Sequence, residues 1–252
     1  MGLDLTVDGH VATIRIDRPE KRNAMSAEMW QALPPLLGRI QVDDRVRVLV
    51  LTGADGTFCA GADIADVARL GGDGLTAAAE EALSTFPKPA IAMIEGYCVG
   101  GGCQLAAACD LRFAADDARF GITPAKLGLV YPEATTRRLV SLIGPAAAKY
   151  LLLSADLVDA PHALRIGLVD EIHPARLLAA RVADFCGMVA SRSQLTVRAS
   201  KEMVDAIAED RLTAGLTARH TAWSKLSVES GEIDEGIAAF LERRPPNFPW
   251  SR

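Results

Sequence analysis

The chain has 252 residues, of which 50% are hydrophobic, and a formal net charge of −5. This length and apolar content suffice for one large domain with a substantial core, or for one domain plus an appendage, and the acidic balance argues against a general nucleic-acid-binding surface. No apolar run reaches the roughly 18 residues of a membrane span, and the N-terminal MGLDLTVDGH has no signal-like apolar segment. We therefore expect a soluble, cytoplasmic protein.

The cysteines and histidines predict neither a disulfide framework nor a metal site. An odd number of cysteines without C-x-x-C spacing is typical of small buried thiols, and the histidines are too dispersed for a metal cluster or a His-based triad. These residues are Cys59, Cys98, Cys103, Cys109 and Cys186, with His10, His162, His173 and His220.

The first segments predict a β-hairpin followed by a helix. Leu3 to Val7 and Val11 to Ile16 alternate well enough for two strands, and Asp8-Gly9 between them is a turn signal. Ser26 is placed to cap the next helix. Pro34 and Pro35 predict a kink or a break inside that helix.

A buried strand and a glycine-bearing loop follow. Val46 to Thr52 is β-branched and apolar, as expected of a strand covered on both faces. The loop runs from Gly53 to Asp63, Ile64 to Leu70 is expected to begin a helix, and Leu75 to Phe86 reads as helix.

The stretch from Lys88 to Asp110 combines a short apolar strand, Ala90 to Ile94, with a glycine turn and an alanine-rich helix. Free N–H groups at a helix start attract negative charge, whether a phosphate or an oxyanion that forms on a carbonyl. Close helix–strand packing explains the glycines equally well. The spacing excludes a P-loop, a G-x-G-x-x-G fingerprint and a G-x-S-x-G nucleophile elbow.

The remainder alternates short elements and then becomes almost wholly helical from Ala175 onward, which indicates an α/β core with a C-terminal helical region. Arg119 to Pro132 is a loop-rich connection. The expected strands are Leu111 to Ala114 and Val169 to Ile172, and the expected helices are Glu133 to Ile143, Pro145 to Leu153 and Ala160 to Arg165.

Four stretches together resemble the crotonase, or enoyl-CoA hydratase/isomerase, superfamily: RPEKRNAMS, VLVLTGADGTFCAGADI, KPAIAMIEGYCVGGGCQLAAACDLRFA and ARFGITPAKLGL. They occur in the family's order and at its spacing. The resemblance implies an α/β fold, a crotonase-type spiral of ββα units with an acyl-CoA site over residues 1–190. It also implies a C-terminal helical trimerisation region over residues 191–252, in a homotrimer or a dimer of trimers.

The resemblance also implies the chemistry. An acyl-CoA thioester binds with its carbonyl oxygen between two backbone N–H groups, which stabilise a thioester enolate. By motif position these donors are Ala62 and Gly101. The resemblance implies no metal and no cofactor other than coenzyme A, which enters as part of the substrate. The resemblance implies that Arg22 contacts CoA near its phosphates. It implies that Ala60, Asp63 and Ile64 lie where family members usually contact the adenine and pantetheine.

The chain departs from this family where hydratases carry two glutamates that hold a water. One normally follows GGGC, where this chain has Gln104. The other falls on Pro124, or on Ala125 if the alignment shifts by one. Gln104 does not titrate usefully near pH 7, so we do not expect efficient crotonyl-CoA hydration by the usual route.

Two nearby residues are candidates to replace the missing acids. Glu133 in a largely apolar pocket would act as a base with a raised pKa, although a carboxylate there also stabilises a helix N-terminus. Tyr131 is a candidate proton donor, although its ring could simply pack with the hydroxyl at the surface. Isomerase or weak, atypical hydratase chemistry is the leading interpretation.

Two alternatives stay open at this point. The segment ITPAKLGLVY is similar to the T-P-x-x-L-G-x-x-Y stretch of methylmalonyl-CoA decarboxylases in the superfamily. Such an enzyme needs no base, because loss of CO₂ supplies the electron pair of the enolate, and Gln104 and Tyr131 could orient the carboxylate and donate the proton. The other alternative is a non-catalytic acyl-CoA-binding paralogue.

Overall fold

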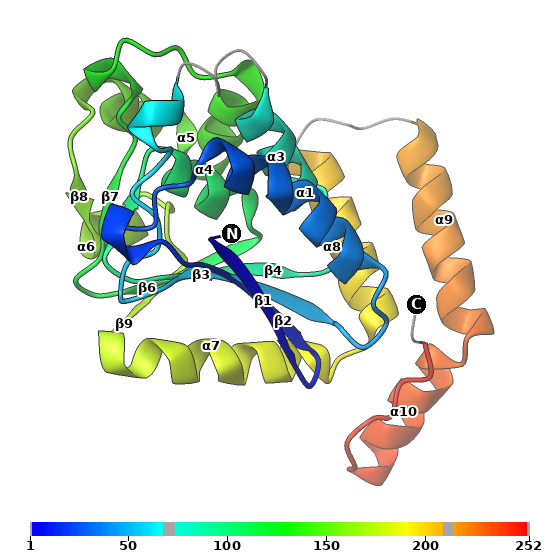
Figure 1. Ribbon diagram of the computed structural model, residues 1–252. Helices are drawn as coiled ribbons and strands as arrows, with labels where there is room; N and C mark the ends of the chain where they lie inside the picture. Colours follow the sequence, from blue (N-terminus) through cyan, green and yellow to red (C-terminus); the bar gives the residue numbers. More distant parts are fainter. Residues whose placement is uncertain (1, 68–73, 209–213, 251–252) are drawn as a thin grey trace.

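The structure is a computed structural model that describes residues 2–67, 74–208 and 214–250. Its centre is a six-stranded sheet in the order β1-β2-β3-β4-β6-β9, in which only the β1–β2 pair is antiparallel (Figure 1). The strands are β1 (Leu3–Asp8), β2 (Val11–Ile16), β3 (Val48–Gly53), β4 (Ala90–Ile94), β6 (Leu111–Ala115) and β9 (Glu171–His173).

The central strands are covered on both faces. Helix α7 (Ala175–Ala190) lies across one face, and helices α1 (Ala27–Gln41), α3 (Leu75–Ser84) and α4 (Gly101–Ala108) lie on the other (Figure 1). Five of the six residues of β3 are buried, as its unbroken apolar sequence predicts for a strand between two helical layers.

The N-terminal predictions are confirmed except at the proline pair. β1 and β2 form the expected hairpin, and the Ser26 hydroxyl accepts the amide of Met29 at the start of α1. The helix nevertheless runs unbroken through Pro34 and Pro35, so the predicted break is wrong. The buried residues on either side of the pair, Leu33 and Leu37, hold both halves against the core, and this packing outweighs the lost backbone hydrogen bonds.

A small second sheet was not predicted. Strands β5 (Tyr97–Val99), β7 (Arg119–Gly121) and β8 (Val158–Asp159) pair in the order β5-β7-β8. β5 leads directly into α4, and β7 pairs with it in parallel. The glycine turn is therefore held by a sheet edge on one side and a helix start on the other.

The later helices agree with the sequence, including the interruption between the two segments of α5 (Glu133–Ser154). Gly144, with φ +74° and ψ 164°, separates them. The remaining helices are α6 (Ala160–Arg165), α8 (Gln194–Ala208), α9 (Ala214–Glu229) and α10 (Glu232–Glu242).

One predicted helix is shorter in the structure than expected. The segment expected to begin a helix at Ile64 forms only a 3₁₀ turn, Ile64–Asp66, and its predicted end at residues 68–70 lies outside the described residues. Within the part of the chain that the structure describes, no helix is both long and apolar enough to cross a membrane.

Candidate functional site

Two loops that are far apart in the sequence meet at the start of α4. One ends in Gly61-Ala62 and is tied to Met25 by a parallel bridge, in which Met25 N–H donates to Gly61 and Asp63 N–H donates to Met25. Because successive N–H groups of an extended chain point to opposite sides, the amide of Ala62 points away from Met25. Gly61 needs its glycine, since its φ is +115°.

The amides of Ala62 and Gly101 lie next to each other. A β-carbon placed on Gly101 would lie 3.2 Å from the amide nitrogen of Ala62, and one placed on Gly61 would lie 3.5 Å from the amide nitrogen of Gly101. Gly101 is the first residue of α4, so its N–H has no intrahelical acceptor. Neither amide has a hydrogen-bond acceptor among the described residues.

Two adjacent N–H groups without acceptors form an anion-binding concavity. The helix start adds the positive end of the α4 dipole to this position. Such a pair suits an oxygen that gains negative charge, such as a carbonyl oxygen on its way to an enolate. These are the two N–H groups that the sequence motif assigns to the thioester oxygen, and that role stays a prediction.

A small cavity of about 10 Å³ lies beside this pair, between α3, α4 and the start of α5. Its volume is close to that of one water molecule. Gln104, Tyr131 and Glu80 line it together with apolar side chains. The Tyr131 hydroxyl lies near Gly100, the residue before Gly101, at 3.8 Å from the position that a β-carbon on Gly100 would occupy.

Glu80 is the titratable carboxylate of this cavity, and its two oxygens differ. Its Oε2 accepts the Thr135 hydroxyl at 2.8 Å and the Arg138 guanidinium at 3.1 Å. Its Oε1 is buried and has no hydrogen-bond partner among the described residues. Burial raises the pKa of Glu80 to about 7, even though the bonds from Thr135 and Arg138 favour the ionised form.

The sequence analysis missed Glu80, although a signal was present. In the helix LTAAAEEALS the buried side chains are Ala79, Glu80 and Leu83. Glu80 stands three residues before Leu83 and therefore shares its face, whereas the side chain of Glu81 is 63% exposed. Helical periodicity alone would have singled out Glu80 as an acid on the apolar face of α3.

Gln104 and Tyr131 are brought together as the sequence suggested. Gln104 is 9% exposed and lies one turn into α4. Burial raises the pKa of Tyr131 far above its ordinary value, and the neighbouring charges of Cys103 and Glu80 add to the effect. Tyr131 is therefore a neutral hydroxyl that can donate a hydrogen bond. At the second glutamate position Pro124 is buried and Ala125 is exposed.

The structure does not place Glu133 in the apolar pocket that the sequence analysis expected. Its side chain is 82% exposed and pairs with Arg137, one helical turn further along α5. It does not line the cavity of Gln104 and Tyr131. The first turn of α5 faces solvent on this side, so Glu133 has the ordinary role of an acidic residue at a helix N-terminus.

The residues predicted to contact CoA lie on one surface loop pair. Arg22 is exposed and its guanidinium stacks on the Tyr97 ring, 5.6 Å from the centroid. Ala60 donates its N–H to the carbonyl of Arg22, and Ile64 is 66% exposed. A cation and an apolar side chain thus remain available to a ligand near Ala62.

The Asp63 side chain instead binds other groups of the protein, and Arg18 and Asn23 hold the loops in place. Asp63 accepts the Ala65 amide and the Arg18 guanidinium, and these bonds lower the pKa of its carboxyl. The fully buried Asn23 accepts the Arg18 amide and donates to the carbonyl of Ala54, 2.8 Å away. Arg18 and Asn23 therefore position the Ala62 loop, a role that the sequence analysis did not assign.

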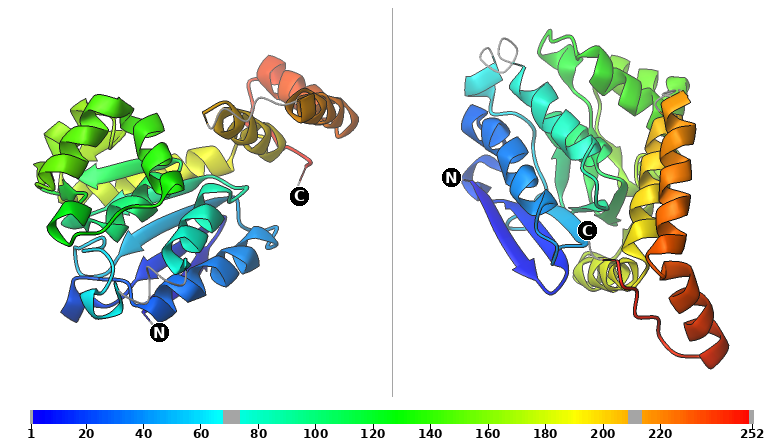
Figure 2. Two further views of the ribbon diagram at one scale, coloured as in Figure 1. Left: turned by 90° about the horizontal axis from the view of Figure 1, so that it is seen from above. Right: turned by 90° about the vertical axis from the view of Figure 1, so that its right-hand side faces the viewer.

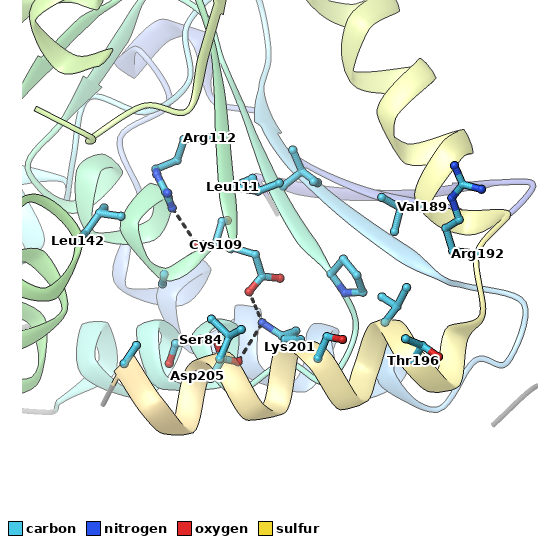
Figure 3. A pocket seen from close by; sticks show the side chains of 18 of the residues that line it. Ser84, Cys109, Leu111, Arg112, Leu142, Val189, Arg192, Thr196, Lys201 and Asp205 are labelled. Carbon is cyan, nitrogen blue, oxygen red and sulfur yellow. Dashed lines mark hydrogen bonds and ion pairs between the residues drawn. The ribbon is translucent and has the colours of Figure 1, made fainter. Parts of the chain in front are cut away.

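A larger groove of about 1340 Å³ lies between α8, the ends of β4 and β6, and helices α5, α7 and α10. Several of its charged side chains are in ion pairs: Lys201 bridges Asp205 and Asp110 (Figure 3), and Arg112 binds Asp170 at 2.8 Å. Neither Ala62 nor Gly101 lines it. They do not line the smaller cavity either; Gln104 and Tyr131 line that cavity, whereas Glu133 lines the groove.

The five cysteines are free and buried, as predicted. Cys59 and Cys103 flank the amide pair, where the Cys59 thiol accepts the Gly61 amide and the Cys103 thiol donates to the carbonyl of Cys98. Burial raises the pKa of Cys59 to about 12. A neutral thiol is a poor nucleophile, so Cys59 belongs to the scaffold.

Comparison with known proteins agrees with the fold and identifies the family. The family model described as enoyl-CoA hydratase/isomerase matches residues 6–250. The chain is 34% identical to the crotonyl-CoA hydratase of Syntrophomonas wolfei (94% of each chain) and 34% identical to the (E)-benzylidenesuccinyl-CoA hydratase of Thauera aromatica (98% and 99%). The crystal structure of an enoyl-CoA hydratase from Bacillus anthracis superposes with a TM-score of 0.90 at 28% identity, over 99% of each chain.

The chain shares the crotonase fold with solved members of the enoyl-CoA hydratase/isomerase family. The chain belongs to the enoyl-CoA hydratase/isomerase family.

Proposed function

We propose that this protein converts an enoyl-CoA thioester through an enolate whose oxygen is held by the amides of Ala62 and Gly101, in an isomerisation or an atypical hydration. The observation that carries the proposal is the proximity of these two N–H groups, neither with an acceptor among the described residues. One such donor typically contributes about 10²–10³ in rate. The proposed reaction uses no metal and no cofactor apart from the CoA of the substrate.

The arrangement of side chains supports an atypical rather than an ordinary hydratase. Gln104 stands at one of the two usual glutamate positions, and Pro124 or Ala125 stands at the other. General acid–base catalysis typically contributes about 10²–10⁴ per group. The relatives named as hydratases therefore support the enolate step more directly than they support fast water addition.

A second candidate is decarboxylation of a malonyl- or methylmalonyl-type CoA thioester. The observation in its favour is that Gln104 and the neutral Tyr131 line one cavity. These groups would orient the departing carboxylate and return the proton. Against it stands Glu80 in the same cavity, because an ionised Glu80 would repel a substrate carboxylate.

The test is a comparison of three thioesters with the purified protein: crotonyl-CoA, a 3-enoyl-CoA and methylmalonyl-CoA, following product formation and CO₂ release. The proposal predicts turnover of the 3-enoyl-CoA, slow hydration of crotonyl-CoA, or both. Reaction of the methylmalonyl thioester alone would establish the decarboxylase instead. Binding of CoA thioesters without turnover of any would identify a binding paralogue.

For the location and assembly of the protein, we propose a cytoplasmic homotrimer or dimer of trimers. The support is the family membership of the chain, together with the apolar surface of its C-terminal helices.

A further inference from the structure

The cavity beside the amide pair contains a carboxylate that neither the motif nor the proposed enolate step uses. The whole Glu80 residue is 2% exposed to solvent. Thr135 and Arg138 both bind its Oε2, and Oε1 is left buried and without a hydrogen-bond partner in the described part of the chain. A buried polar atom of this kind costs free energy unless something binds it.

A purely structural role accounts for only half of this arrangement. The Oε2 contacts link α3 to α5 and would suffice to hold the two helices together. The Glu80 side chain lines a cavity with room for about one water molecule, and Oε1 has no other group bound to it in the described part of the chain. Gln104 and Tyr131 line the same cavity, and the Tyr131 hydroxyl lies 3.8 Å from where a β-carbon on Gly100 would be.

We propose that Glu80 is the acid–base residue of this site, and that its Oε1 takes a proton from the bound thioester or from a water in this cavity and then returns it. The assignment rests on the proposed function, since it needs the enolate that Ala62 and Gly101 would hold. It fills the role that Gln104 and Pro124 leave vacant. Glu80 comes from α3, and the two usual positions come from α4 and from the loop after β7.

The proton transfers balance with Glu80 alone. In isomerisation, the carboxylate takes a proton from C2 of a 3-enoyl-CoA, and the electron pair moves to the thioester oxygen. The acid then returns the proton to C4, which leaves the double bond between C2 and C3. In hydration, the carboxylate takes a proton from water as the oxygen bonds to C3, and the acid then protonates C2.

The surroundings of Glu80 suit both steps, removal of the proton and its return. The groups that act on it are Arg138 and Thr135 on α5, Tyr131 ahead of α5, and Glu81 on its own helix. Burial raises its pKa to about 7, so both the accepting and the donating form are populated near neutral pH. A carboxyl near that value suits a residue that must do both.

The experiment compares wild type with Glu80→Gln, which keeps the shape and an oxygen for Thr135 and Arg138, using a 3-enoyl-CoA and crotonyl-CoA. We expect kcat to fall by about 10²–10⁴ with KM changed only a few-fold. Wild-type kcat should rise with pH through the neutral range, because the ionised form accepts the proton, and Glu80→Gln should lack that rise. Asp184→Asn, at an exposed acid on α7 outside the site, is the control and should behave as wild type.

Glu80→Asp separates chemistry from folding, with thermal melting recorded for every variant. It keeps a carboxylate, so it should retain more activity than Glu80→Gln together with a pH-dependent kcat. Equal losses in Glu80→Asp and Glu80→Gln that follow their melting temperatures would make Glu80 structural and overturn the assignment. Unchanged turnover in Glu80→Gln would also overturn it and leave the proposed function standing. An inactive wild type would overturn both.

Discussion

The buried carboxyl of Glu80 makes the stability of the protein depend on pH in a predictable direction. Its pKa is about 7 in the folded protein, against an ordinary value of 4.5. Between these values the folded state binds more protons than the unfolded state, so this group lowers the free energy of unfolding as the pH rises from about 4.5 to 7. Below that window the carboxyl is protonated in both states, and the effect vanishes.

Glu80→Gln should remove this dependence. As the pH rises, Glu80→Gln should gain stability relative to wild type. The gain in free energy of unfolding should be about 3 kcal/mol in total, because one pKa unit corresponds to about 1.4 kcal/mol. Denaturant unfolding at pH 5, 6, 7 and 8 measures it. The difference between Asp184→Asn, at an exposed acid on α7, and wild type should not change with pH. Parallel pH curves for Glu80→Gln and wild type would contradict the burial of this charge.

At Gly101 the absence of a side chain keeps the space in front of the amide pair open. A β-carbon there would lie 2.8 Å from the Trp30 ring and 3.2 Å from the Ala62 nitrogen. Gly101→Ala should therefore reduce kcat by at least about 10²-fold, the typical effect of losing one such donor.

The control for Gly101→Ala is Gly38→Ala in α1, where a β-carbon meets nothing within 4 Å. It should preserve turnover and slightly raise the melting temperature, because alanine favours a helix. Full activity in Gly101→Ala would refute the role of this amide.

These residues also show what the sequence can and cannot predict about the site. The glycine turn before α4 is a local pattern that the sequence shows, and the family's motifs then assign Ala62 and Gly101 within it. Helical periodicity places Glu80 on the apolar face of α3, but its contacts with Thr135 and Arg138 depend on how α3 packs against α5, which no local pattern encodes. The expected burial of Glu133 was wrong for the same reason, since only the packing decides which side of the first turn of α5 faces solvent.

At the scale of elements, α1 shows packing overriding local preference. The helix spans Ala27–Gln41 with Pro34 and Pro35 inside it, at positions that cost up to about 3 kcal/mol each in a helix interior. Pro35 is exposed, so its ring contributes little to the core.

Pro35→Ala should therefore stabilise the protein by about 1–3 kcal/mol, because it restores a backbone N–H without opening a cavity. The measurement is the free energy of unfolding in urea, with turnover as a check that the site is intact. Leu37→Ala, on the buried face of the same helix, should destabilise by about 2–5 kcal/mol. A loss of stability in Pro35→Ala would show that the proline pair supports the helix.

The elements that the sequence missed are those without a periodic signal. β5 has three residues and β8 has two, too few for alternation to register. They form because the paired segments are brought together by the surrounding fold. β3 and α3, by contrast, were predicted from their own buried runs.

At the scale of the whole molecule, α9 and α10 extend away from the sheet (Figure 2). On α10, Phe240 is 83% exposed and Leu241 is 74% exposed. These adjacent exposed apolar side chains suit the expected subunit contact. The division at residue 191 and the trimeric assembly stay predictions, and this surface supplies a direct test of the second.

Replacing Phe240 and Leu241 together by serine should shift the protein from a trimer or hexamer toward smaller species, because burial of these side chains would be lost. Light scattering coupled to size-exclusion chromatography measures the mass. Val42→Ser is the control, since Val42 is 76% exposed at the end of α1. A monomeric wild type would contradict the expected assembly.

The two donors at Ala62 and Gly101 belong to the main chain, and this has a consequence for how the protein could be redesigned. Replacements of the surrounding side chains leave both N–H groups in the covalent backbone, as long as the glycines stay. In the proposed reaction, the groups that bind the negative charge are thus separate from the side chains that transfer protons. A designer could relocate the acid among α3, α4 and the loop after β7 and obtain a different reaction on an unaltered scaffold.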